Sequence, residues 1–290
     1  MTPRLVAIIL AFAAPANAST QSDVAPFMEG EISTDRNEYN ISVSDDERTM
    51  VFARSEADFA DARIMVSERT TRDMQWRSPK PISFSDGRYR DSDPWLTPDG
   101  RTLYFVSDRP TAARPDKRDL DIWRSVRRND AWSRPEHLGD AVNGPGEELG
   151  PEMHGNVLYF SSARRSGTGG LDIYVAQASE RGFGQPELLP PPINSPASES
   201  DFTVSKDGRT ALFWRQVEDG GLLHVSRLSA DGSWSVPEPL SSTINIGPFN
   251  FTPAFSRDGS HVTFASTRAR DGQPLGMADI YERKLPIPAE

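Results

Sequence analysis

Four acidic residues and one asparagine recur at matching positions, about fifty residues apart. Each lies three residues before a proline or an apolar residue. The set is Glu38 (Ile41), Asp91 (Pro94), Glu148 (Pro151), Glu199 (Phe202) and Asn250 (Pro253). Carboxylates that are brought close together raise one another's pKa or recruit a cation. Two of them placed across a sugar linkage can hydrolyse it.

Three interpretations of these carboxylates are open. Each could accept backbone N–H bonds from the next repeat, because residues that recur in every repeat usually hold repeats together. The set could instead surround a Ca²⁺ ion, which takes roughly six to eight oxygen ligands. A pair of them could also act as a glycosidase.

Three arginines also recur, each four residues after a strand phenylalanine, and an aspartate follows in the same units. The pairs expected from this order are Arg109 with Asp121, Arg164 with Asp172 and Arg268 with Asp279. Arginine suits planar, bidentate pairing with a carboxylate, and the chain has 28 Arg against four Lys. We therefore expect structural Arg–Asp pairs within or between repeats.

Other chemistries lack the residues that they need. There is no cysteine, so disulfides, thiolate nucleophiles and Cys-based zinc sites are excluded. The four histidines fall at unrelated positions in their repeats, and no G-x-S-x-G sequence occurs. A formal charge of −10 argues against nucleic acid as the main partner.

The elements that position the acidic set are short strands. An apolar segment that ends in phenylalanine recurs at intervals of 51 to 55 residues, at Phe52, Phe105, Phe160, Phe213 and Phe264. A turn precedes each, most clearly Asp99-Gly100, Asp207-Gly208 and Asp258-Gly259. A second strand and an aromatic residue three positions before a proline follow in most copies. Units of four strands and about 40 to 50 residues are typical of propeller blades.

We therefore predict an all-β fold, a β-propeller of five blades with four antiparallel strands each, with six blades as the alternative. The fifth unit ends without an outer strand of its own, so residues 24–32 are expected to supply it and close the ring. The innermost strands line the channel of a propeller, so the acidic set should surround one mouth. The loops 107–120, 162–171 and 215–221 are expected to lie on the binding face.

The first residues have the pattern of an export signal. A basic residue, Arg4, precedes an apolar run that ends at Ala16-Asn17-Ala18, which predicts a cleavable signal peptide over residues 1–18. Residues 19–290 then form one domain without a transmembrane span. Its repeats are expected near residues 38–87, 88–146, 147–197, 198–248 and 249–285.

The repeats resemble the TolB-type, WD40-like propeller repeats of bacterial envelope proteins. The similarity is strongest in Trp132–Gly139 with Asn143, Glu148 and Pro151, and in Leu158–Arg164 followed by Gly169–Tyr174. This resemblance implies a propeller in the periplasm or at the cell surface, and a protein-binding module associated with the outer membrane and peptidoglycan. We therefore expect a periplasmic, non-catalytic binding or scaffold protein, monomeric and without a bound cofactor, that recognises an envelope protein or a peptidoglycan-associated component. The alternative is an exported glycoside hydrolase or carbohydrate-binding propeller that uses the acidic set.

Overall fold

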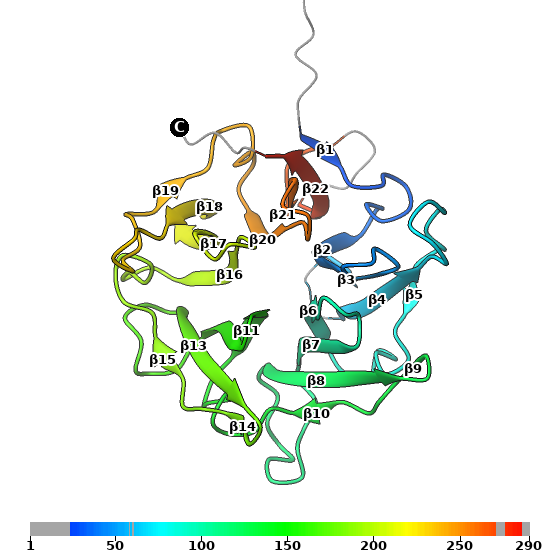
Figure 1. The fold of residues 1–290 in the computed structure, drawn as a ribbon, viewed down its shortest axis with the longest axis horizontal. Helices are drawn as coiled ribbons and strands as arrows, with labels where there is room; N and C mark the ends of the chain where they lie inside the picture. Colours follow the sequence, from blue (N-terminus) through cyan, green and yellow to red (C-terminus); the bar gives the residue numbers. More distant parts are fainter. Residues whose placement is uncertain (1–23, 58, 60, 271–275, 286–290) are drawn as a thin grey trace, which may run out of the picture.

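The computed structural model describes residues 24–57, 59, 61–270 and 276–285. In these ranges the chain forms five antiparallel sheets arranged in a ring, as Figure 1 shows. The predicted five-bladed propeller is confirmed. The predicted signal peptide lies outside the described residues. Within the described ranges, no helix is long and apolar enough to cross a membrane.

Each blade begins at the ring centre and ends at its rim. Blade 1 contains β2 (Asn37–Val43), β3 (Thr49–Ser55), β4 (Arg63–Glu68) and β5 (Lys80–Pro81). Blade 2 contains β6 (Asp91–Leu96), β7 (Thr102–Ser107), β8 (Asp121–Arg128), β9 (Ala131–Trp132) and β10 (Glu136–His137). Blade 3 contains β11 (Glu148–His154), β12 (Val157–Ser162), β13 (Asp172–Ser179), β14 (Gly182–Phe183) and β15 (Glu187–Leu188).

The last two blades follow the same order. Blade 4 contains β16 (Glu199–Val204), β17 (Thr210–Val217), β18 (Gly220–Arg227) and β19 (Glu238–Pro239). Blade 5 contains β20 (Asn250–Phe255), β21 (His261–Ser266) and β22 (Asp279–Lys284), and its outer strand is β1 (Val24–Pro26). Val24 pairs with Arg283 and Pro26 with Tyr281, so the start of the described chain closes the ring, as predicted (Figure 1).

In blades 2 and 3 the outer strand consists of two short pieces. Strands β9 and β10 both pair with β8, and β14 and β15 both pair with β13. Pro135 and Pro186 lie between the pieces, where a residue without an N–H group interrupts the ladder. The predicted loop 215–221 is wrong, because β17 runs to Val217 and β18 begins at Gly220.

The hydrophobic core lies between neighbouring blades. The five strand phenylalanines are at most 1% exposed. One apolar cluster joins blades 1 and 2 through Val51, Leu96 and Phe105, and an equivalent cluster joins blades 4 and 5. Because each blade buries its faces against two neighbours, the ring orients all five innermost strands towards one axis.

The two ends of each blade carry different connections. The hairpin face bears the tight turns between the first and second strands, including Pro98–Arg101, where Gly100 adopts a positive φ of 68°. The loop face bears the connections between the second and third strands, including residues 108–120 and 163–171. The acidic set begins the innermost strands, and it therefore lies towards the loop face.

Candidate functional site

The acidic set lies inside the blades. Glu38, Glu148, Glu199 and Asn250 are 0% exposed and Asp91 is 1% exposed. Each faces the end of the second strand in its own blade; Glu199, for example, pairs in register with Arg215, and Glu148 with Ser162. Sequence reasoning expected these side chains at the channel mouth, whereas the structure surrounds them with protein.

Every blade supplies an arginine to this position. In blades 1 and 4, Arg54 and Arg215 donate from Nε to the carboxylates of Glu38 and Glu199, over 2.7 and 2.8 Å. In blades 2, 3 and 5 a serine stands there, and the arginine comes two residues later. That arginine donates from Nε to the serine hydroxyl over 2.8 to 3.0 Å, as in Arg164 to Ser162.

The five guanidinium groups have the same surroundings. Each lies 5.2 to 5.6 Å from the ring centre of its blade's strand phenylalanine. Four of them also donate to a main-chain carbonyl in the preceding connection, including Val142 for Arg164 and Ile244 for Arg268. Each of these four arginines therefore joins its own blade to the segment that arrives from the previous blade.

The carboxylates are also bound by the arriving segments. Thr34 donates from both its backbone N and its Oγ1 to Glu38, over 3.0 and 2.6 Å. Ser195 does the same to Glu199. Burial raises the pKa of Glu38 and Glu199, whereas these hydrogen bonds and the arginines oppose the shift. These carboxylates are held as hydrogen-bond acceptors within the fold.

The predicted Arg–Asp partners are wrong. Arg109 pairs with Asp91, and Arg164 lies 3.4 Å from Glu148. Arg268 donates to Ser266 and to the carbonyl of Ile244. The arginine side chains point from the end of the second strand towards the first strand. The third strand, which carries the predicted aspartates, lies on the opposite side of the second strand.

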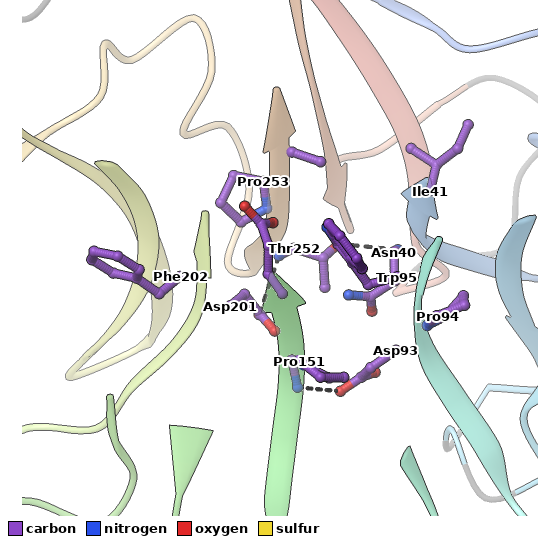
Figure 2. A pocket seen from close by; sticks show the side chains of 13 residues that line it. Asn40, Ile41, Asp93, Pro94, Trp95, Pro151, Asp201, Phe202, Thr252 and Pro253 are labelled. Carbon is purple, nitrogen blue, oxygen red and sulfur yellow. Dashed lines mark hydrogen bonds between the residues drawn. The ribbon is translucent and has the colours of Figure 1, made fainter. Parts of the chain in front are cut away.

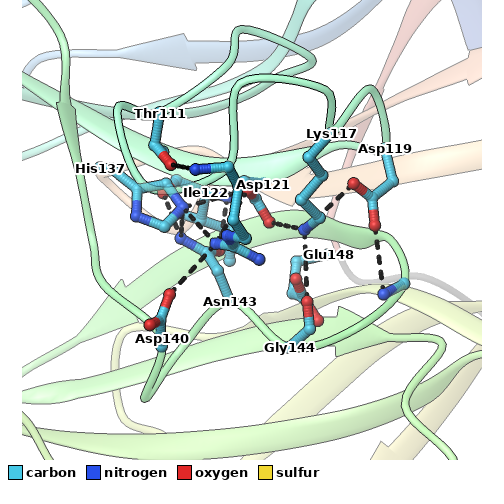
Figure 3. Close-up of polar contacts among 12 residues, drawn as sticks. Thr111, Lys117, Asp119, Asp121, Ile122, His137, Asp140, Asn143, Gly144 and Glu148 are labelled. Atoms are coloured by element: carbon cyan, nitrogen blue, oxygen red, sulfur yellow. Dashed lines mark hydrogen bonds and ion pairs between the residues drawn. The ribbon is translucent and has the colours of Figure 1, made fainter.

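The third-strand aspartates instead hold the loops that precede them. Asp121 accepts from Lys117 and His137, as Figure 3 shows. Asp172 accepts from the backbone N of Thr168 and Gly169 over 2.9 and 3.0 Å. Asp279 forms two bonds with Arg270, over 2.8 and 3.0 Å.

Three asparagines join neighbouring parts of the ring. Asn143 Oδ1 accepts from the backbone N of Ile122 over 2.7 Å, and its Nδ2 donates to the same residue's carbonyl over 3.0 Å (Figure 3). Asn194 binds Ile173 in the same way, and Asn245 binds Leu223. The three asparagines lie 51 residues apart, so their recurrence can be recognised in the sequence.

A small central cavity lies where the innermost strands meet, and Figure 2 shows its lining. Its volume is about 30 Å³, room for about two water molecules. In every blade the lining includes the residue two positions after the acidic set. All five have a positive φ of 48° to 56°: Asn40, Asp93, Gly150, Asp201 and Thr252.

Backbone groups at this level join neighbouring blades around the axis. Gly150 donates its N–H to Asp93 over 3.0 Å, and Thr252 donates its N–H to Asp201 over 3.2 Å. Asn40 donates its N–H to the hydroxyl of Thr252 over 3.3 Å. The positive φ interrupts the ladder in each innermost strand and turns these groups towards the neighbouring blade.

Sequence reasoning missed the cavity-lining residues because their types differ from blade to blade. Asparagine, aspartate and glycine tolerate a positive φ better than other residues, which was the available signal. Burial, together with the nearby charge of Asp93, raises the pKa of Asp201 to about 7. Burial raises the pKa of Glu152, at the same cavity, to about 7.

The described part of the chain has no group of three or more His, Asp or Glu side chains placed to bind a metal ion. The cavity presents the carboxylates of Asp93, Asp201 and Glu152. Of these, Glu152 already accepts from Thr203 and from the backbone N of Val204, over 2.9 and 3.2 Å. This arrangement does not favour the Ca²⁺ interpretation.

No protein-family model matches the chain, and no curated protein matches its sequence. Solved structures match its fold. TolB from Acinetobacter baumannii has a TM-score of 0.50 and 13% identity, over 87% of this chain and 55% of that one. The chain thus spans about half of that TolB. A putative TolB from Agrobacterium tumefaciens has a TM-score of 0.53 and 16% identity, over 88% and 92% of the two chains.

The fold of a glycoside hydrolase is also similar. A thermostable family-43 glycoside hydrolase has a TM-score of 0.59 and 10% identity, over 89% of this chain and 93% of that one. At identities this low, the structural matches establish only that the chain shares its propeller fold with both kinds of protein. They do not distinguish a binding function from a hydrolytic one.

Proposed function

We propose that this protein is a non-catalytic binding propeller of the bacterial envelope, which recognises an envelope protein or a peptidoglycan-associated component. The observation that carries the proposal is that the repeated carboxylates are buried and bound within the fold. Glu38, Asp91, Glu148 and Glu199 are at most 1% exposed and are bound by groups of their own blade and its connections. No substrate reaches them unless the blade opens.

The size of the central cavity supports the same conclusion. Small-molecule sites occupy roughly 300 to 1,000 Å³, at least ten times the 30 Å³ found here. A sugar ring therefore does not fit beside Asp93 and Asp201. The glycoside hydrolase alternative has support from fold similarity alone.

Export to the periplasm is part of the proposal. It rests on the signal-like residues 1–18 and on the resemblance of the repeats to those of TolB-type proteins. A ring of blades with two wide faces is a common platform for binding another protein.

Photo-crosslinking in the native envelope tests the proposal. A photoreactive residue replaces Ala113 on the loop face, Lys206 on the hairpin face or Gln185 on the outer rim, all exposed positions. We expect one dominant protein adduct from one face and none from the rim. The absence of a protein adduct from both faces, together with glycan hydrolysis by the purified protein, would contradict the proposal.

A further inference from the structure

A polar groove runs between blades 1 and 2 on the hairpin face. Its volume is about 920 Å³, which falls within the usual range for ligand sites, roughly 300 to 1,000 Å³. Its walls are the turns that follow β2 and β6 and the ends of β4 and β8. We call it the blade 1–2 groove.

Arginines dominate this groove. Six of them line it, in a chain with a formal charge of −10: Arg48, Arg69, Arg77, Arg101, Arg127 and Arg128. Four carboxylates share the lining: Asp46, Glu68, Asp99 and Asp130. The groove therefore has an excess of positive charge on a negatively charged protein.

Two of the arginines belong to the floor of the groove. Arg127 of blade 2 donates to Glu68 of blade 1 over 2.6 Å and to the hydroxyl of Thr49 over 3.3 Å, so it joins the two blades. Arg69 pairs with Glu47 over 3.0 Å and lies 4.3 Å from the ring centre of Trp76. These contacts hold both guanidinium groups in fixed positions.

The other four arginines have no ion pair among the described residues. Arg48, Arg77, Arg101 and Arg128 are all exposed. The nearest turn carboxylates are already engaged, since Asp46 accepts from Ser44 and from the backbone N of Arg48, over 2.7 and 3.0 Å. Asp99 makes the equivalent bonds to Thr97 and Arg101. Four guanidinium groups are thus available to an anionic ligand.

The mixture of charges in the groove favours one class of anion. Asp46 and Asp99 have a pKa below the usual range: at Asp46 the hydrogen bonds outweigh the opposing effect of burial, and at Asp99 the bond from Thr97 is the largest cause. Both therefore carry charge at neutral pH. These fixed negative charges repel a densely phosphorylated polymer. Their turn bonds use Oδ1, so Oδ2 of Asp46 and Asp99 can still accept backbone N–H groups, which a peptide has and a polyphosphate lacks.

We propose that the blade 1–2 groove binds an acidic peptide segment of a partner protein. The guanidinium groups of Arg48, Arg77, Arg101 and Arg128 would pair with its carboxylates. This inference rests on the proposed binding function and assigns to it a place and a ligand chemistry. Arginine forms bidentate, charge-assisted bonds with carboxylates, and these are stronger than neutral hydrogen bonds.

Peptide selection tests the inference. The folded protein is used to select from a displayed library of random dodecapeptides, and the enriched peptide is labelled for fluorescence anisotropy. We expect enriched sequences with a net negative charge, and affinity that falls at least tenfold in R48E/R101E. The loss reflects two charge-assisted contacts, which are stronger than neutral hydrogen bonds.

The chain offers a matched control. Arg209 follows Asp207-Gly208 just as Arg101 follows Asp99-Gly100, and it makes the same turn bond. Arg181, between β13 and β14 of blade 3, is a second exposed arginine and does not line the groove. The R181E/R209E variant changes the net charge as much as R48E/R101E does, and we expect it to keep affinity within twofold. All four sites are exposed, so folding should be preserved.

Three results would overturn the inference: enriched peptides without negative charge, equal loss in both variants, or binding of vesicles with anionic phospholipid but of no peptide. The outcome separates this inference from the proposed function. If envelope crosslinks persist in R48E/R101E and the peptide result fails, the binding function stands and the groove assignment falls. If acidic peptides bind but neither face gives an envelope adduct and the purified protein hydrolyses glycan, the groove assignment stands and the proposed function falls.

Discussion

Arg215 donates from Nε to Glu199 over 2.8 Å, and the two residues are opposite each other in neighbouring strands of blade 4. Blade 1 repeats this pair with Arg54 and Glu38. In the other three blades a serine occupies the arginine's register position, and an arginine two residues later supplies the guanidinium group. Two different sequence patterns therefore bring a guanidinium group to the same place in the blade.

Blade 5 allows a test of this equivalence, because Asn250 stands where other blades have a carboxylate. Burial lowers the pKa of the nearby Arg268, and among the described residues this arginine has no carboxylate partner. We expect N250D to keep the free energy of unfolding within about 1 kcal/mol of wild type, since the new charge can pair with Arg268.

The same substitution at Asn194 serves as the control in urea unfolding. Asn194 is 2% exposed, and its Nδ2 donates to the carbonyls of Ile173 and Leu189. N194D replaces that donor with a charged acceptor, and we expect a loss of about 2–4 kcal/mol. Equal losses in N250D and N194D would contradict the equivalence of the blades.

The close approach of blades 3 and 4 at the central cavity leads to a second prediction. Gly150 has a φ of 54°, and a Cβ there would lie 3.0 Å from Asp201 Oδ1 and 3.3 Å from the Asp201 backbone N. Gly155 has a similar φ of 61° with nothing within 4 Å of an added Cβ. We expect G155A to lose about 1 kcal/mol from backbone strain and G150A to lose about 1–2 kcal/mol more.

Thermal and urea unfolding of both variants measure this difference. If G150A and G155A lose the same free energy, the blades do not approach each other as closely as the structure places them.

Stability should also depend on the protonation of Asp201. Its pKa of about 7 lies above the ordinary value of 3.8, because of burial and of the nearby Asp93. The folded state therefore binds more protons than the unfolded state between about pH 4 and pH 7. Its free energy of unfolding falls as the pH rises through this range.

We expect D201N to reduce this pH dependence, since an amide is neutral at every pH. The amide oxygen of the variant can still accept from the backbone N of Thr252, so D201N should match wild type near pH 5 and exceed its stability by about 1–3 kcal/mol at pH 8. Urea unfolding of D201N and wild type at pH 5 and pH 8 measures this difference in stability. A variant that is less stable than wild type at pH 8 would contradict the assigned shift.

Much of the fold could be predicted from the sequence because residues that recur in each repeat have the same structural role in each blade. The strand phenylalanines form the contacts between blades, and the Asp-Gly pairs form turns that require a positive φ at glycine. Closure by β1 followed from the missing outer strand of blade 5. These features depend on local residue type and on spacing along the chain.

The site was predicted less well, because it depends on where side chains point. Arg109 was assigned to Asp121, but Asp91 lies within its reach at the end of the neighbouring strand. The cavity-lining residues share a backbone conformation and not a residue type, so Asp93 and Asp201 had no recurring signal. Their contacts are with the neighbouring blade and exist only once the two blades have packed together.

The central claim is that the repeated carboxylates hold the blades together and perform no catalysis. The most direct measurement combines urea unfolding with a glycan-hydrolysis screen on wild type and E199Q. Removal of the charge leaves Arg215, whose side chain is 18% exposed, without its carboxylate partner. We predict a loss of about 2–4 kcal/mol in the free energy of unfolding and no hydrolysis by either protein. Hydrolysis by wild type that E199Q abolishes, with the free energy of unfolding unchanged, would contradict the account.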